Sequence, residues 1–280
     1  MITNALTVDV EEYYHGMEFE AAVPGDRSAR LPSRVEANVE RVLLLLAAHN
    51  ASATFFIVGT VAEAHPGLVQ TIAQGGHEIA CHSYRHELVS RQTPQEFRDD
   101  IRQAKAMLEH LSGMTVVGYR APNYSIQRGQ PWAYDILLEE GFRYDSSVYP
   151  IVHDRYGQID APRFAYEIRR VGDQGLLEFP IGTLRVFGIN LPLGGGGYFR
   201  LLPEQIFRFG IRYVNAREHQ PVMFYFHPWE LDPDQPRPPM PWHHRFRHYV
   251  GLKKQERKLG RLLQQVRFTT VKTILGLDKG

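Results

Sequence analysis

The sequence predicts an α/β protein built around a parallel barrel, and two observations predict this fold. Short apolar runs alternate with longer amphipathic segments, which is the pattern of strands connected by helices. Polar side chains follow directly after several of these runs, as they do where parallel strands end at an active site. A length of 280 residues allows one large domain of this kind.

The individual elements follow from periodicity and from capping residues. Residues 34–49 have apolar residues at helical spacing, and Ser33 before them is a residue type that caps helices. Pro66 interrupts the helical pattern of residues 61–74. The expected order is strand 5–9, helix 34–49, strand 53–58, helices within 61–74, strand 77–81, helix 94–111, strand 116–119, helix 131–140, strand 142–145 and strand 222–227.

Two segments fall outside this alternation. Residues 149–198 contain Pro162, Pro180 and Pro192 and a four-glycine run, so we expect a flexible, substrate-facing loop there, with a plain turn as the alternative. The run lacks the Lys-Ser/Thr of a phosphate-binding loop. Residues 252–266 predict a basic amphipathic helix, which is either a solvated face or a contact with an anionic lipid surface.

Composition excludes several classes of protein. A formal net charge of +1 gives no electrostatic reason to expect a nucleic-acid partner. The single cysteine, Cys81, excludes an intramolecular disulfide. The first predicted strand follows Met1 without a signal sequence, and the longest apolar run is too short to span a membrane. We therefore expect a cytoplasmic protein without a transmembrane segment.

Polar clusters after two predicted strands indicate a metal site. His82 and His86 follow strand 77–81, and the acids Asp9 and Glu11 end strand 5–9. Two imidazoles and one carboxylate form a metal site that leaves positions open for a water and a substrate oxygen. The histidine spacing alone is weak evidence, since a second pair with this spacing occurs near the C-terminus. Its position at a strand end favours a metal-dependent hydrolase.

Five short motifs, in order, resemble those of the polysaccharide deacetylase family, whose members are metal-dependent carbohydrate esterases that remove N- or O-acetyl groups from glycans. The resemblance implies a deformed (β/α) barrel of seven strands. The motifs are Thr7-Val8-Asp9-Val10-Glu11, His82-Ser83-Tyr84-Arg85-His86, Arg120-Ala121-Pro122-Asn123-Tyr124, Asp145 within FRYDSSVYP, and His227 within VMFYFHPW.

The chain resembles one branch of this family over nearly its whole length. The stretches TVDVEEYY, DSSVYP and LPLGGGGYFRLLP are similar to those of deacetylases in bacterial exopolysaccharide gene clusters linked to exosortase systems. The resemblance implies one deacetylase-like domain over residues 1–280, with a family-specific extension from about residue 230 to 280. The implied partner is an acetylated glycan or a lipid-linked oligosaccharide, with weak peripheral membrane contact.

The first motif departs from the family pattern, which usually has a second Asp where this chain has Val10. Residues two apart on a strand share a face, so Asp9 and Glu11 can reach one site. We predict that Glu11 is the carboxylate ligand beside the two histidines and that Asp9 is the base. The reverse assignment stays open, and Glu12 is a weaker candidate. Two histidines and one carboxylate suit zinc, and the same ligands suit cobalt, nickel or iron.

The later motifs imply the remaining catalytic roles. Arg120 is similar to the arginine that pairs with the base, and the backbone N–H of Asn123 matches the oxyanion donor. His227 is expected to protonate the leaving group, oriented by Asp145 through its other ring nitrogen. The expected substrate contacts are Asn123, Tyr124 and Trp229.

Three functions are therefore open. The first is a metal-dependent deacetylase acting on N-acetyl or O-acetyl groups of a bacterial exopolysaccharide or its precursor. The second is a metal-independent amide hydrolase of the allantoinase type, favoured by the altered first motif but opposed by the intact pair His82 and His86. The third is a catalytically silent glycan-binding module, which would lack the site residues that this chain carries.

Overall fold

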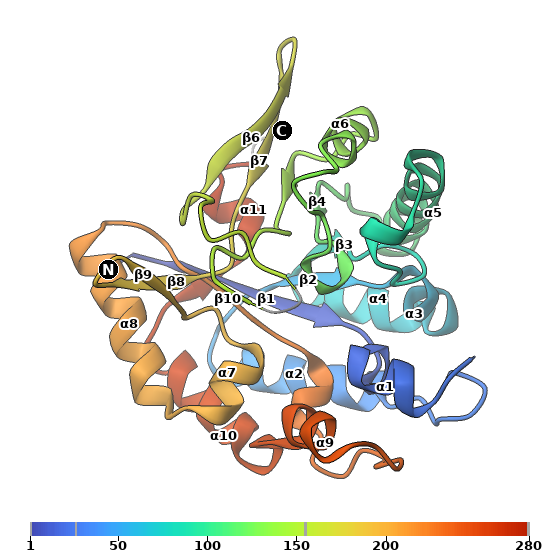
Figure 1. Ribbon diagram of the computed structural model, residues 1–280, viewed down its shortest axis with the longest axis vertical. Coiled ribbons are helices and arrows are strands. Elements are labelled where there is room, and N and C mark those ends of the chain that lie inside the picture. Colours follow the sequence, from blue (N-terminus) through green and yellow to red (C-terminus); the bar gives the residue numbers. More distant parts are fainter. Residues whose placement is uncertain (1, 26, 154–155, 279–280) are drawn as a thin grey trace.

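The computed structural model describes residues 2–25, 27–153 and 156–278. At its centre is a sheet with the strand order β10-β1-β2-β3-β4-β5-β7-β6, in which the neighbours from β10 to β7 are parallel (Figure 1). Strands β6 and β7 pair in antiparallel fashion. The bounds are β1 Asn4–Val10, β2 Thr54–Ile57, β3 Glu78–Cys81, β4 Gly118–Tyr119, β5 Tyr144–Asp145, β6 Tyr166–Val171, β7 Gln174–Glu178 and β10 Met223–Phe226. A further strand, β11 Phe268–Thr269, pairs with β1.

The segment that follows β7 joins the two edges of this parallel set. The N–H of Ile181 donates to the carbonyl of Val148, just beyond β5, at 3.0 Å. The next N–H, on Gly182, donates to the carbonyl of Met223 in β10, also at 3.0 Å. The predicted α/β barrel is therefore confirmed, with seven parallel strands in the described chain and a closure that is made by single hydrogen bonds.

Helices pack around the sheet, and local sequence sets their ends (Figure 1). In α5, Thr93 and Glu96 form a capping box, and Gly113 ends the helix in the left-handed conformation at φ 67°. Among the described residues, no helix is long and apolar enough to cross a membrane. The helices are α1 Met17–Ala22, α2 Val35–Ala48, α3 Gly59–Ala64, α4 Pro66–Gln74, α5 Pro94–Ser112, α6 Trp132–Glu139, α7 Gly196–Leu201, α8 Glu204–Arg217, α9 Trp242–Tyr249, α10 Leu252–Leu263 and α11 Val271–Ile274.

Helix α2 is not capped as the sequence predicts. The carboxylate of Glu12 accepts hydrogen bonds from the N–H groups of Arg34 at 3.2 Å and Val35 at 3.4 Å. The hydroxyl of Ser33, the expected cap, donates to the same carboxylate. Glu12 thus satisfies the free N–H groups at the start of α2, which explains why it does not join the metal-binding acids.

The segment expected to be a flexible loop contains two hairpins. Strands β6 and β7 form one, and β8 Thr183–Val186 with β9 Ile189–Pro192 forms the other. The glycine run lets the chain pass close to β10: an added Cβ on Gly195, at φ 109°, would lie 2.2 Å from the carbonyl oxygen of Tyr225. The glycines therefore serve packing and the start of α7. Residues 154–155 of this segment lie outside the described residues.

We expect Gly118→Ala to destabilise the barrel, because a Cβ there would lie 2.1 Å from the ring of buried Tyr144. That ring is held in place by a 2.7 Å hydrogen bond from its hydroxyl to Glu78. Overpacking of this kind costs about 1–3 kcal/mol of the free energy of unfolding, measurable by urea denaturation.

The matched control is Gly67→Ala in α4, where an added Cβ meets nothing within 4 Å. This change should leave the stability unchanged or raise it by up to about 1 kcal/mol. Equal urea midpoints for the two variants would contradict the close packing of Gly118 on Tyr144.

Candidate active site

The predicted site residues gather around a cavity of about 110 Å³ at the carboxyl ends of β1, β3, β4 and β10. Parallel strands end at the same rim, so motifs far apart in the sequence meet there. The cavity is lined by Asp9, Glu11, His82, His86, Ala121, Asn123, Tyr124, Tyr156, Tyr225 and His227.

Glu11, His82 and His86 form a group that could hold a metal ion. Their ligand atoms all lie within 4.8 Å of one another, and Nε2 of His86 is 2.7 Å from Oε2 of Glu11. Nδ1 of His82 donates to the carbonyl of Arg120 at 2.7 Å, which leaves its Nε2 free to bind. Burial lowers the pKa of His82 to about 4, so its imidazole is neutral at pH 7, as a metal ligand must be.

The Glu11 carboxylate is ionised in this setting. Burial alone would raise its pKa, but the imidazoles of His86 and His227 hold the pKa of Glu11 well below its usual range. The indole N–H of Trp229 donates to Oε1 of Glu11 at 3.1 Å. Trp229 is buried and its ring stacks with His227. Trp229 thus contacts the candidate ligand Glu11 and also lines the larger cavity of about 570 Å³, and its predicted contact with a substrate stays a prediction.

Strained backbone turns the two histidines into the cavity. Ser83 and His86 have positive φ values of 62° and 58°, a conformation that non-glycine residues adopt only when other contacts enforce it. The enforcing contact is Asp100 in α5, whose carboxylate accepts from the N–H of Tyr84 at 2.6 Å and of Arg85 at 3.2 Å. Sequence reasoning missed Asp100. Its position among the buried apolar residues of a predicted helix could have indicated that this acid has a structural partner.

Asp9 is paired with a buried arginine, as predicted. Nη1 of Arg120 donates to Oδ1 of Asp9 at 2.5 Å and to the hydroxyl of Thr7 at 2.9 Å. Its other nitrogens donate to the carbonyl and the hydroxyl of Ser146. Arg120 is fully buried, and although burial opposes its charge, Asp9 raises the pKa of Arg120 above its usual value. The pair keeps Asp9 oriented at the cavity.

His227 is oriented by Glu230, and the predicted role of Asp145 is wrong. Nδ1 of His227 lies 2.7 Å from Oε1 of Glu230, which is fully buried. Nε2 of the same ring lies 3.7 Å from Glu11 and 4.0 Å from Asp9, on the cavity side. Burial lowers the pKa of His227, but Glu11 and Glu230 outweigh this and raise it to about 9. The signal was local, because His227-Pro-Trp-Glu230 forms one turn of 3-10 helix.

Asp145 instead belongs to a buried pair of acids in the sheet. The hydroxyl of Ser147 donates to its carboxylate at 2.6 Å, and β5 and β7 pair Asp145 with Glu178. Burial raises the pKa of Asp145 to about 6, and burial together with the charge of Asp145 raises the pKa of Glu178 well above its usual range. These two carboxyls thus hold a proton in the folded protein near neutral pH.

Another histidine, which sequence reasoning missed, lies next to the metal-binding group. The ring of His15 stacks on that of His86 with centroids 5.1 Å apart. Burial lowers the pKa of His15 to about 3, so it is neutral. His15 follows the first motif in the short helix Tyr13–His15 and thereby supports the orientation of His86.

Asn123 and Tyr124 line the cavity opposite the metal-binding group. Both have positive φ values, 51° and 54°, which is a strained backbone at a predicted substrate contact. The ring of Tyr124 contacts those of Tyr149, Tyr156 and Tyr225 edge to face. Tyr124, Tyr156 and Tyr225 line the cavity, and Tyr149 packs behind them in the core.

The small cavity opens into a longer groove. A cavity of about 570 Å³ shares Glu11 and His227 with it and extends toward Trp242 in α9. A cavity of about 370 Å³ shares Asn123 and Tyr124 with it and extends toward Arg128. These two cavities are the arms of the groove, and both border the small cavity.

Residues 26–133 match the family model of the polysaccharide deacetylases. This segment of the chain is therefore similar to polysaccharide deacetylases. His82, His86 and Arg120 lie within the matched segment. Residues 146–276 match a second model, described as a domain of unknown function, and this segment contains His227 and Glu230. The expected division into one domain with an extension from about residue 230 stays a prediction.

Curated relatives are named as deacetylases, which are hydrolases of the C–N bond in acetylated sugars. A peptidoglycan-N-acetylglucosamine deacetylase of Bacillus cereus is 35% identical over 94 residues, 33% of this chain and 34% of that protein. A peptidoglycan deacetylase of Helicobacter pylori is 28% identical over 133 residues, 45% of this chain and 44% of that protein. The chain thus spans less than half the length of these relatives.

Solved structures share the fold. A protein classed as a polysaccharide deacetylase from Mycobacterium smegmatis is 21% identical with a TM-score of 0.63, over 98% of this chain and 88% of that one. The allantoinase Puue is 19% identical with a TM-score of 0.61, over 96% and 87%. Proteins of different chemistry therefore share this fold, so the reaction has to be inferred from the site residues.

We expect the Asp145–Glu178 pair to make stability fall as pH rises. A carboxyl whose pKa is raised by folding stabilises the protein below its unfolded pKa, and this contribution is lost as pH rises through the folded pKa. The loss should be about 2 kcal/mol between about pH 4 and about pH 7. Asp145→Asn should flatten this slope, as measured by urea unfolding across that range.

The matched control is Asp99→Asn on the exposed side of α5, which should leave the slope as in the wild type. A wild-type slope in Asp145→Asn would contradict a shared proton in this pair.

Proposed function

We propose that the chain is a metal-dependent deacetylase that removes acetyl groups from the amino sugars of a glycan. One observation carries the proposal: the ligand group Glu11, His82 and His86 lies in one small cavity, with Asp9 beside it and His227 near Glu11. This cavity contains candidate residues for the metal ligands, the base and the acid together. A binding module without catalytic activity would not need this combination.

The ligand set fits a divalent metal. Three side chains supply two imidazole nitrogens and one carboxylate oxygen from buried positions, and His82 and Glu11 are in the protonation states that binding requires. Zinc is the metal we propose, and cobalt, nickel or iron suit the same donors. A bound metal would polarise the acetyl carbonyl and lower the pKa of water at the site. Asp9 is held by Arg120, so we assign Glu11 as the ligand.

The protein side chains then divide the proton transfers. Asp9, oriented by Arg120, accepts a proton from the attacking water. His227, protonated and oriented by Glu230, donates a proton to the leaving nitrogen. The backbone N–H of Asn123 is the proposed donor to the developing oxyanion at the edge of the cavity.

The groove favours a polymer over a small amide such as an allantoinase substrate. Two arms of about 570 Å³ and about 370 Å³ border the small cavity, and exposed Trp242 lines the larger arm. We propose an acetylated hexosamine within a bacterial exopolysaccharide or its lipid-linked precursor, with O-acetyl groups as the alternative. The expected cytoplasmic location stays a prediction.

Metal content should separate the ligands from the base. We expect His82→Ala to lose bound zinc, because one of three ligands is removed, and Asp9→Asn to keep zinc but lose at least about 100-fold in turnover. Elemental mass spectrometry gives the metal content, and acetate release from acetylated chitooligosaccharides gives the activity.

His110→Ala, an exposed histidine in the last turn of α5, is the control and should keep both properties. If Asp9→Asn lost zinc while Glu11→Gln kept it, the assignments of ligand and base would be reversed. Wild-type protein that takes up no zinc and releases no acetate would contradict the proposed function.

Glu230→Gln tests the orientation of the acid. Without the Glu230 charge the pKa of His227 should fall, so the alkaline limb of the pH profile of kcat/KM should move to lower pH. Turnover should drop, since Glu230 holds the ring of His227. Glu204→Gln, a buried acid in α8 near Arg261, is the matched control and should keep the wild-type profile. An unshifted limb in Glu230→Gln would contradict this role.

A further inference from the structure

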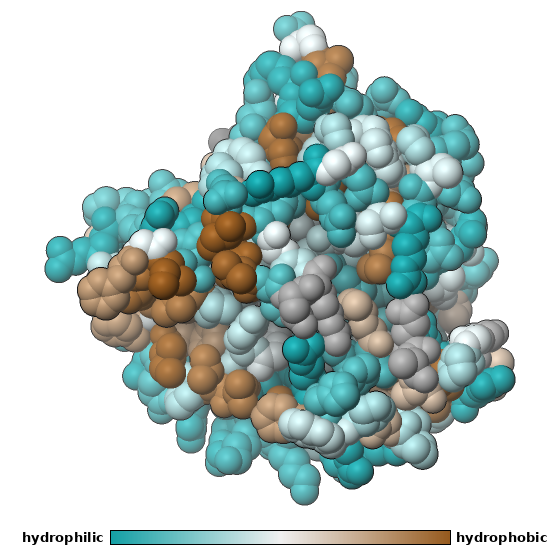
Figure 2. Space-filling model, in the orientation of Figure 1, coloured by the Kyte–Doolittle hydropathy of each residue, from teal (hydrophilic) through white to brown (hydrophobic). Residues whose placement is uncertain are grey.

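An exposed apolar surface covers one side of the molecule, over the hairpin β8–β9 and helix α8. Figure 2 shows hydrophobic side chains gathered where Figure 1 draws these elements. Phe209 in α8 is 67% exposed and Ile189 in the hairpin is 61% exposed. Soluble monomers rarely expose such contiguous apolar side chains without a binding partner. The apolar surface consists of Phe187, Ile189, Leu191, Leu202, Ile206, Phe209 and Tyr213.

The tip of the hairpin is built to present an aromatic side chain. Phe187 is fully exposed, and its backbone has a positive φ of 47°, followed by Gly188 at 81°. Such hairpin turns normally carry Asn, Asp or Gly at both central positions, because a bulky side chain is strained there. A phenylalanine at this position contributes nothing to the core, so we expect its side chain to contact a binding partner at the surface.

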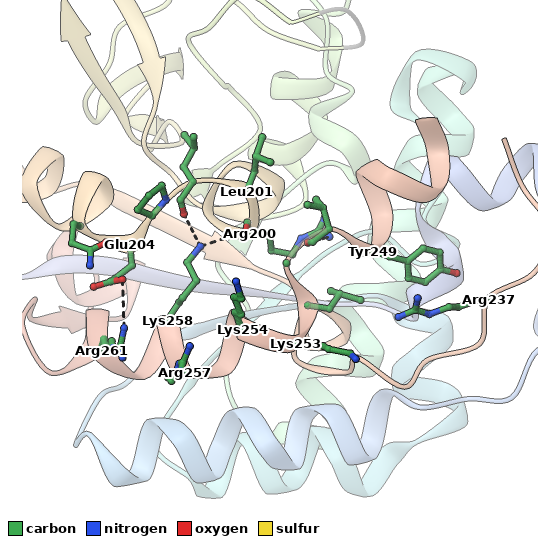
Figure 3. A pocket seen from close by; sticks show the side chains of 16 residues that line it. Arg200, Leu201, Glu204, Arg237, Tyr249, Lys253, Lys254, Arg257, Lys258 and Arg261 are labelled. Atoms are coloured by element: carbon green, nitrogen blue, oxygen red, sulfur yellow. Dashed lines mark hydrogen bonds and ion pairs between the residues drawn. The ribbon is translucent and has the colours of Figure 1, made fainter. Parts of the chain in front are cut away.

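The apolar surface borders a basic groove of about 660 Å³ between α10 and the link from α7 to α8 (Figure 3). Lys253, Lys254, Arg257 and Arg261 project from α10 along one wall, and Leu201 lies on the other side. Leu202 lines the groove and also belongs to the apolar surface, so the two are continuous.

The charges of this groove are largely uncompensated. Glu204 is the acid among the described residues that line it, and its carboxylate is 4.0 Å from Arg261. Lys253, Lys254 and Arg257 are exposed and have no carboxylate partner in the part of the chain that the structure describes. An excess of positive charge therefore lies directly beside the apolar side chains.

We propose that this combined face binds the surface of an anionic lipid membrane. Apolar side chains enter the interface while lysine and arginine contact the acidic headgroups, so the two features act together. A second copy of this chain fits less well, because a two-fold interface would bring the same basic groove against itself. An isolated basic groove would suit any polyanion, but the exposed phenylalanines require an apolar phase.

Membrane binding would orient the active site toward a lipid-linked substrate, an extension that rests on the proposed function. Arg200, Leu201 and Val250 line both the basic groove and the larger arm of the substrate groove. A docked molecule would therefore hold the mouth of that arm near the lipid surface. A glycan carried on a lipid anchor would reach the cavity from the membrane side.

The test is co-sedimentation of the full chain with vesicles of phosphatidylcholine alone and with vesicles in which about a third of the lipid is phosphatidylglycerol. We expect binding to the anionic vesicles and little to the neutral ones. Lys253→Gln with Lys254→Gln and Arg257→Gln should weaken binding about tenfold or more. The double variant Phe187→Ser with Phe209→Ser should weaken it similarly, and circular dichroism should show that each variant is folded.

The matched control replaces three basic residues on the other side of the barrel, Arg102→Gln, Arg143→Gln and Arg170→Gln, and should bind like the wild type. Equal binding of the Lys253, Lys254 and Arg257 variant and the wild type would overturn the proposal. Wild-type protein that binds neither kind of vesicle would also overturn it. So would sedimentation equilibrium that shows a dimer of the wild type formed through Phe187. Acetate release from a water-soluble substrate is measured in parallel, so a failure of the proposed function is seen separately from a failure of membrane binding.

Discussion

The buried guanidinium of Arg120 joins most of the parts on which the site depends. It donates hydrogen bonds to Asp9 and Thr7 in β1 and to Ser146 beyond β5. Its Cζ atom lies 4.2 Å from the centroid of the Phe56 ring in β2. The backbone carbonyl of Arg120 accepts a hydrogen bond from the Nδ1–H group of His82. Removing one partner of a buried ion pair costs about 3–5 kcal/mol of the free energy of unfolding, so the Asp9 carboxylate stabilises the barrel as well as serving the proposed chemistry. Structure and function therefore depend on the same ion pair.

Around that pair, each functional side chain is held by a neighbour that does not face the cavity. Asp100 secures the strained turn that carries the histidines, and Trp229 fixes one oxygen of Glu11. Glu230 holds His227. Ligands that are fixed in this way lose little conformational freedom when a metal or substrate binds, which favours affinity and precise proton transfer.

The C-terminal half of the chain surrounds the site with surfaces of a different character. Helices α7, α8 and α10 and the hairpin β8–β9 carry the apolar surface and the basic groove, and α7 also lines the larger arm of the proposed substrate groove. The same segment includes the residues that match the second family model. A common barrel thus supplies the proposed chemistry, while this segment offers the features by which a substrate carrier would be selected.

The sequence by itself determined the alternation of strands and helices, because hydrophobic periodicity reports local geometry, and it determined the ligand candidates Glu11, His82 and His86, because strand ends in such folds share one rim. It could not decide which acid supports His227. The resemblance implied Asp145, and only tertiary packing pairs Asp145 with Glu178, whereas Glu230, three residues after His227, lies 2.7 Å from its ring in a local turn. Nor could it show that Phe187 lies exposed beside the positive charges of α10, since neighbours on a surface come from distant segments that only the folded barrel brings together.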